Sequence, residues 1–75
     1  AAKARRMSYH ERRELAAMPE KIQGLEAEQL ELQRAISDPN LFKDDPAQGA
    51  AALQRLQAVA AEIETAYSRW DELES

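Results

Sequence analysis

Apolar side chains recur at steps of three and four residues along two stretches of this chain, with polar positions between them. The first stripe consists of Leu15, Met18, Ile22, Leu25, Gln29, Leu32 and Ile36. The second consists of Leu53, Leu56, Ala60, Ile63, Tyr67 and Trp70. This spacing is typical of the seam of a coiled coil, so the pattern predicts an all-α protein.

The first arm of the predicted fold begins at a helix cap. Ser8-Tyr9-His10-Glu11 has the form of a capping box, in which Ser8 and Glu11 bind each other's backbone amides. Pro19 removes an amide donor and clashes with the preceding turn, so we expect the arm to be kinked or broken near this residue. The predicted helices of this arm are 9–18 and 19–37.

The second arm begins after a tip at residues 38–45. Asp38-Pro39 ends the first arm, because the residue before a proline avoids the helical region. Asp38 is also expected to cap a single helical turn that starts at Pro39 within the tip. Asp45-Pro46 starts the next helix, with aspartate as the cap and proline at the first position, and this helix is predicted over 46–73. Residues 8–75 therefore form one coiled-coil hairpin, and residues 1–7 are expected to be a basic linker end or a frayed tail.

A short tip makes the two arms antiparallel, and facing residues of an antiparallel pair have a constant index sum. The two stripes pair at a sum of 85, as in Leu25 with Ala60 and Met18 with Tyr67. This register packs Tyr67 and Trp70 into the seam near Pro19. The alternative use of Tyr67 and Trp70 is a stacking platform for the bases of single-stranded nucleic acid.

Two large apolar residues, Leu41 and Phe42, lie in the tip. They are expected either to fold back as a plug onto Ile36 and Leu53, or to point outward to a partner together with Lys43.

The net charge of −4 is unevenly distributed along the 75 residues. Residues 1–13 carry five basic groups against Glu11 alone, which gives +4, and residues 14–75 carry five basic against thirteen acidic groups, which gives −8. The basic stretch is thus the part that attracts a polyanion. Its candidate phosphate contacts are Lys3, Arg5, Arg6, Arg12 and Arg13, with Lys21 and Lys43 as weaker candidates.

The sequence lacks the residues of a catalytic or metal site. There is no cysteine, and the one histidine, His10, is expected to be a solvated helix residue. Gly24 and Gly49 belong to no phosphate-binding loop, and a two-helix rod has no concave pocket. We therefore expect no enzyme activity, cofactor, metal or small-molecule substrate in this domain. No apolar run is long enough to span a membrane, and a cytoplasmic protein is expected.

Several segments resemble, in order and spacing, the C-terminal domain of Uup-type ABC-F ATPases. They are Arg6-Met7-Ser8-Tyr9-His10-Glu11-Arg12-Arg13-Glu14-Leu15, Met18-Pro19, Asp38-Pro39, Asp45-Pro46 and Tyr67-Ser68-Arg69-Trp70-Asp71-Glu72-Leu73. The resemblance implies a coiled-coil domain behind two ATP-binding cassettes, which would hold ATP and Mg in the parent chain. The sequence departs from the family pattern at Asn40-Leu41-Phe42, which weakens any transfer of tip contacts.

What the resemblance implies for function is binding to DNA or ribosomal RNA, in ribosome function or DNA repair. The alternative is a protein-interaction hairpin that docks on its own cassettes or on a ribosomal protein, through Leu41, Phe42 and the acidic faces. The two hypotheses differ in salt dependence, because phosphate binding weakens with salt and apolar docking barely responds.

Overall fold

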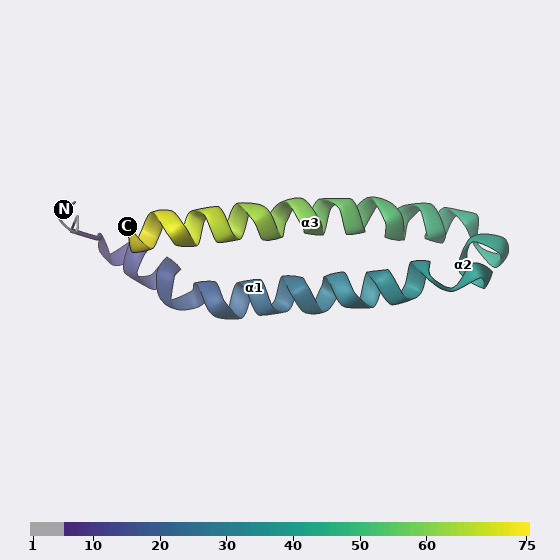
Figure 1. Cartoon of the computed structure of the whole chain (residues 1–75), viewed down its shortest axis with the longest axis horizontal. Coiled ribbons are helices and arrows are strands. Elements are labelled where there is room, and N and C mark those ends of the chain that lie inside the picture. The colour runs from purple at the N-terminus through teal and green to yellow at the C-terminus, as the bar shows by residue number, and fades with distance from the viewer. Residues whose placement is uncertain (1–5) are drawn as a thin grey trace.

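The computed structural model describes residues 6–75 as a rod with extents of 56 × 19 × 15 Å (Figure 1). Two long helices, α1 (Tyr9–Ile36) and α3 (Pro46–Glu74), run antiparallel. A six-residue helix, α2 (Pro39–Asp44), joins them at one end. The described residues contain no strand, so the predicted all-α helical hairpin is confirmed.

Each helix begins at the cap that the sequence predicts. The Ser8 hydroxyl accepts the Glu11 amide at 3.1 Å, and Glu11 accepts the Ser8 amide at 2.9 Å, which completes the capping box of α1. Asp38 accepts the Asn40 amide at 3.0 Å at the start of α2, and Asp45 accepts the Gln48 amide at 3.1 Å at the start of α3. Each of these bonds satisfies an amide that the helix itself leaves without a partner.

Pro19 does not break the first arm. The predicted helices 9–18 and 19–37 form one continuous helix with Pro19 inside it. In Figure 1 the first turns of α1, drawn in purple, are out of line with the rest of the helix. The missing donor at Pro19 is tolerated because Met18 and Ile22, on either side of it, are buried in the same core.

The predicted seam of the first arm agrees with the observed burial, but the predicted seam of the second arm is wrong at alternate positions. Leu53 and Tyr67 are 42% and 47% exposed, whereas Val59 is 0% exposed. The face of α3 turned to α1 consists of Ala52, Leu56, Val59, Ile63, Ala66, Trp70 and Leu73.

The corrected seam also changes the register. Met18, Ile22, Ala66 and Leu73 form the buried cluster. Ile22 with Ala66 adds to 88, and the observed seam positions of the two helices all pair at this sum rather than at 85. Trp70 packs against the cluster as predicted, and Tyr67 lies outside it.

Candidate nucleic-acid interface

The basic end of the chain is only partly within the described residues. Lys3 and Arg5 lie outside them, and Arg6, Arg12 and Arg13 are exposed. Arg12 and Arg13 are consecutive residues in the first turns of α1, so they project from neighbouring positions around the helix. This end of α1 thus presents guanidinium groups to solvent at one end of the rod.

Short local contacts orient two of these arginines. Arg12 Nη1 donates to the Met7 carbonyl at 3.2 Å, and Arg13 Nη1 donates to the Tyr9 hydroxyl at 3.2 Å. The Arg13 guanidinium also lies 5.8 Å from the centre of the Tyr9 ring, within cation–π range. Each guanidinium has five N–H donors, so both keep donors for a phosphate.

The antiparallel fold places acidic groups at the same end of the rod. The last turn of α3 carries Asp71, Glu72 and Glu74, and Figure 1 shows the C-terminus beside the first turns of α1. The sequence suggested a basic end that stands apart from an acidic body. In the fold, the field of the arginines is reduced by these carboxylates.

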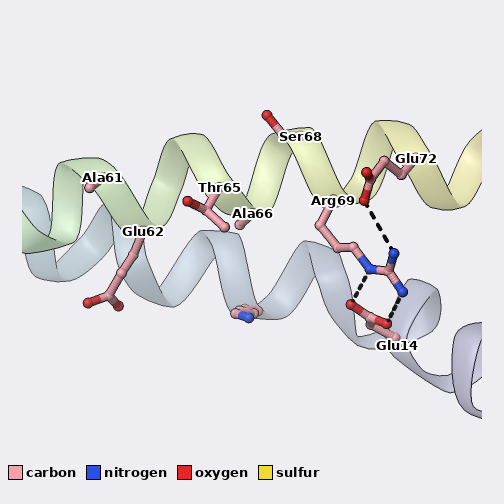
Figure 2. A pocket seen from close by; sticks show the side chains of 9 residues that line it. Glu14, Ala61, Glu62, Thr65, Ala66, Ser68, Arg69 and Glu72 are labelled. Carbon is pink, nitrogen blue, oxygen red and sulfur yellow. Dashed lines mark hydrogen bonds and ion pairs between the residues drawn. The ribbon is translucent and has the colours of Figure 1, made fainter.

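One side of the hairpin is closed by ion pairs across the seam. Arg69 Nε and Nη2 bind the two carboxylate oxygens of Glu14 at 2.7 and 2.9 Å, and Arg69 Nη1 reaches Glu72 at 3.2 Å (Figure 2). Arg55 binds Glu28 in the same bidentate way, also at 2.7 and 2.9 Å. The residue numbers of both cross-seam pairs add to 83. These ion pairs therefore define the alignment of α1 with α3 on one side of the hairpin, independently of the apolar core.

We call this side the charged flank, defined as Glu14, Lys21 and Glu28 of α1 and Arg55, Glu62 and Arg69 of α3. Along α1 the charges alternate acid, base, acid, and along α3 they alternate base, acid, base. Lys21 and Glu62 share the same index sum of 83 as the two bridged pairs. The opposite order of charge on the two helices favours this antiparallel register over others.

The pKa values on the charged flank follow from these bonds. Hydrogen bonds from Arg69 and Arg55 lower the pKa values of Glu14 and Glu28 below the ordinary 4.5, and the pKa values of both arginines are raised. All four side chains remain partly exposed, so the pairs contribute to register more than to net stability.

A shallow groove of about 610 Å³ lies over this flank, lined by Glu14, Lys21, Ala61, Glu62, Thr65, Ala66, Ser68, Arg69 and Glu72. In Figure 2, Arg69 reaches from α3 toward Glu14, and Ser68 points away from that pair. The charged groups of the groove are of both signs, and none of its residues is a histidine or cysteine. Nothing in the described part of the chain groups three metal-binding side chains, and the groove has no nucleophile–base pair.

His10 is exposed in the first turn of α1, as the sequence suggests. Its ring lies edge-on to the Tyr9 ring, with 5.8 Å between the ring centres. Among residues 6–75 no helix is long and apolar enough to cross a membrane.

At the tip, Phe42 and Leu41 pack against different parts of the hairpin. A Cβ built on Gly49 would lie 2.5 Å from Cδ1 of Phe42, so this ring lies directly on the α3 backbone. Leu41 is half-buried and lines a small hollow with Ala35 and Gln48. Phe42 thus folds back, as the plug hypothesis expects, but onto Gly49 instead of the exposed Leu53. Lys43 is exposed in the last turn of α2.

The sequence favoured a seam position for Tyr67 and left a surface platform with Trp70 as the alternative, and in the structure Tyr67 is a surface residue. Its ring stacks on Trp70, with 6.3 Å between centres and 15° between planes, and its hydroxyl donates to Glu26 at 3.0 Å. This bond raises the pKa of Tyr67. Tyr67 and Glu26 have an index sum of 93, which places them on the side of the seam opposite to the charged flank.

Comparison with known proteins gives a consistent family match. The family model described as ABC transporter C-terminal domain matches residues 6–75. Over 72 residues the chain is 40% identical to the ATP-binding protein Uup-like and to the ATP-binding protein Uup of Haemophilus influenzae, and over 70 residues it is 33% identical to the ATP-binding protein Uup of Escherichia coli K12.

These alignments cover 93–96% of this chain and 11–16% of the relatives, so the chain spans a small part of their length. No solved structure matches it.

Proposed function

Because this chain belongs to the family of ABC transporter C-terminal domains, we propose that it is the nucleic-acid-binding end of a cytoplasmic ATP-binding protein. The chain is a C-terminal domain and not an enzyme in its own right. In the parent protein the cassettes lie outside these residues and bind ATP and Mg. The hairpin carries DNA or ribosomal RNA contacts for ribosome function or DNA repair.

The observation that carries the proposal is the exposure of Arg6, Arg12 and Arg13 at one end of a rod. Each guanidinium matches the geometry of a phosphate, and a rod 56 Å long holds this end well away from its tip. The remaining candidates, Lys3 and Arg5, precede this stretch in the sequence and add to its charge. Two basic residues of α3, Arg55 and Arg69, are already bound to carboxylates and are poor candidates.

Within the described part of this end, residues 6–13, no element is shaped to read base edges. Arginine contacts to phosphates carry no sequence information, so binding is proposed to depend on charge and on backbone shape. The tip alternative, protein docking through Leu41, Phe42 and Lys43, has less support because one part of the Phe42 ring contacts Gly49, which leaves 39% of the residue exposed.

The test is a comparison of two triple variants with equal loss of charge. Arg6→Gln, Arg12→Gln and Arg13→Gln remove three charges at the basic end. Lys21→Gln, Arg34→Gln and Lys43→Gln remove three from exposed sites elsewhere, including the two weaker candidates, so the comparison also ranks those candidates against the basic end. Fluorescence anisotropy with labelled duplex DNA, branched DNA and ribosomal RNA measures affinity, and circular dichroism confirms the helices.

The first variant is expected to lose at least tenfold in affinity for the preferred ligand, and the second less than threefold, because about 1 kcal/mol or more is lost with each charged hydrogen bond. Equal losses in the two variants would show that only net charge matters and would reject the basic end as the binding site.

A further inference from the structure

The side of the hairpin opposite to the charged flank is apolar and acidic. Leu53, Ala60 and Tyr67 lie seven residues apart along α3, so they form one line on the helix surface. Leu30 of α1 lies one turn beyond Glu26, which binds Tyr67, and is therefore on the same side. We call this surface the open flank.

Large apolar side chains on the open flank are exposed although they belong to the two long helices. Leu30 is 48% exposed, and Leu53 and Tyr67 are exposed to a similar extent. Of the five large apolar residues that are exposed in the described chain, these are three. An apolar line at heptad spacing beside an occupied seam is the pattern of a helix that packs against two neighbours.

The border of the open flank is acidic, and basic residues lie near it only at the end of the rod that carries the first turns of α1. Glu26, Glu64, Asp71 and Glu74 lie along it, and Tyr67, Trp70, Asp71 and Glu74 line one hollow at its end. Most of the described basic residues are elsewhere: Lys21, Arg55 and Arg69 are on the charged flank, and Arg34 and Lys43 are near the tip. The exception is the basic end, where Arg6, Arg12 and Arg13 lie at the same end of the rod as Asp71 and Glu74.

We propose that the open flank binds a basic amphipathic helix of a partner protein. Leucine-like side chains of that helix pack on Leu30, Leu53 and Tyr67, and its lysines or arginines pair with the acidic border. The line from Leu53 to Tyr67 is roughly 21 Å long, at ~1.5 Å per residue, which matches four turns of the partner helix.

The same charges exclude other occupants. A nucleic acid would be repelled by the acidic border, and in a symmetric dimer the acidic border of one copy would meet that of the other. This surface adjoins the basic end at Asp71 and Glu74 but is made of other residues, and the proposal goes beyond the proposed function.

The test uses the 75-residue chain and two designed helical peptides. Both have leucines at heptad spacing, and one carries lysines where the other carries glutamates. Amide NMR spectra of the chain locate binding, and the fluorescence of Trp70, the one tryptophan, gives affinity. The lysine peptide is expected to bind in the micromolar range and to shift the amides of Leu30, Leu53 and Tyr67. Absence of binding, or shifts centred on Lys21 and Glu62, would overturn the proposal.

Matched variants separate this site from general attraction to an acidic protein. Glu64→Gln with Asp71→Asn removes two charges from the open flank, and Glu20→Gln with Glu31→Gln removes two from other exposed positions of α1. The first pair is expected to weaken the lysine peptide at least fivefold more than the second. Equal weakening would overturn the site.

Leu53→Ser tests the apolar part, because this side chain is largely outside the core and its loss should leave the helices intact. It is expected to weaken the lysine peptide about tenfold. Unchanged affinity would contradict docking on the apolar line. Self-association of the chain that Leu53→Ser abolishes would assign the surface to a second copy and overturn the partner helix.

Discussion

The ring of Phe42 lies so close to Gly49 that a methyl group on the glycine would come within 2.5 Å of Cδ1 and 3.1 Å of Cγ. Glycine is therefore needed in the first turn of α3 for the tip to fold back. Gly24, in the middle of α1, has no atom within 4 Å of the corresponding position, so its surroundings do not require glycine.

The two glycines thus give opposite expectations for one substitution. Gly24→Ala should raise the free energy of unfolding by about 0.5–1 kcal/mol, because alanine is the better helix former. Gly49→Ala should lower it, because the gain in propensity is outweighed by displacement of Phe42. Urea unfolding measures both. With Phe42→Ala in place, Gly49→Ala should become stabilising like Gly24→Ala, and a loss that persists would contradict the contact.

The observed seam predicts that truncation of Val59 destabilises the hairpin more than truncation of the larger Leu53. Val59→Ala should cost about 1–2.5 kcal/mol, because Val59 is fully buried. Leu53→Ala should cost less than about 1 kcal/mol, because Leu53 is exposed. Urea unfolding compares the two, and the reverse order would restore the seam inferred from the sequence.

Disulfide formation measures the register. Cysteines at Leu25 and Ile63, whose residue numbers add to 88, should crosslink efficiently. Cysteines at Leu25 and Ala60, whose residue numbers add to 85, should crosslink poorly. Preferential crosslinking of the second pair would contradict the arrangement of α1 and α3 described here.

The ion pairs of the charged flank predict an acid dependence of stability. The folded pKa values of Glu14 and Glu28 are lowered, so their contribution is present above the ordinary 4.5 and is lost as the pH falls through the lower folded values. Thermal unfolding should therefore show a lower Tm for Glu14→Gln with Glu28→Gln at pH 7. This difference should vanish near pH 2, and one that does not change with pH would contradict the assignment.

The acidic end of α3 predicts a gain of nucleic-acid affinity. Asp71→Asn with Glu74→Gln removes two carboxylates from the end of the rod that carries Arg12 and Arg13. A charge ~10 Å away in water contributes ~0.4 kcal/mol, so affinity for duplex DNA should rise about twofold per carboxylate at low salt. Anisotropy titrations measure the change, and an unchanged or lower affinity would mean that the phosphates bind elsewhere.

How far the sequence predicts the fold depends on how local each interaction is. The caps at Ser8, Asp38 and Asp45 were predicted correctly, because each involves residues two or three apart. Pro19 was expected to kink or break the helix. The helix continues through Pro19, and its first turns are out of line with the rest, so the kink agrees with the prediction and the break does not occur. Burial of Met18 and Ile22 is a tertiary effect that propensity does not contain.

The seam of α3 was misplaced because two apolar lines compete there. The line that was assigned to the seam has on average the larger side chains, and it consists of Leu53, Ala60 and Tyr67. The line that faces α1 in the structure has smaller side chains at the corresponding positions, Ala52, Val59 and Ala66. The charged residues contain the information on the register that the apolar pattern lacks. Glu14 with Arg69 and Glu28 with Arg55 are complementary at one index sum, which singles out the observed register from the sequence.

The candidate site was predictable only as a set of charges. Arg6, Arg12 and Arg13 are exposed as expected, but the nearness of Asp71 and Glu74 follows from the antiparallel fold. The open flank was not predicted, because the sequence analysis assigned Tyr67 to the seam.

The salt dependence of duplex DNA binding tests the central claim most directly. Each phosphate contact adds a slope of about −0.9 to log affinity against log salt, so wild-type chain and the variant Arg6→Gln, Arg12→Gln and Arg13→Gln should differ by about 2.7 if each arginine binds one phosphate. A steep wild-type slope that flattens in this variant, and stays steep in Lys21→Gln, Arg34→Gln and Lys43→Gln, is the predicted result. A wild-type slope near zero, or one that the first variant leaves unchanged, would contradict nucleic-acid binding through the basic end.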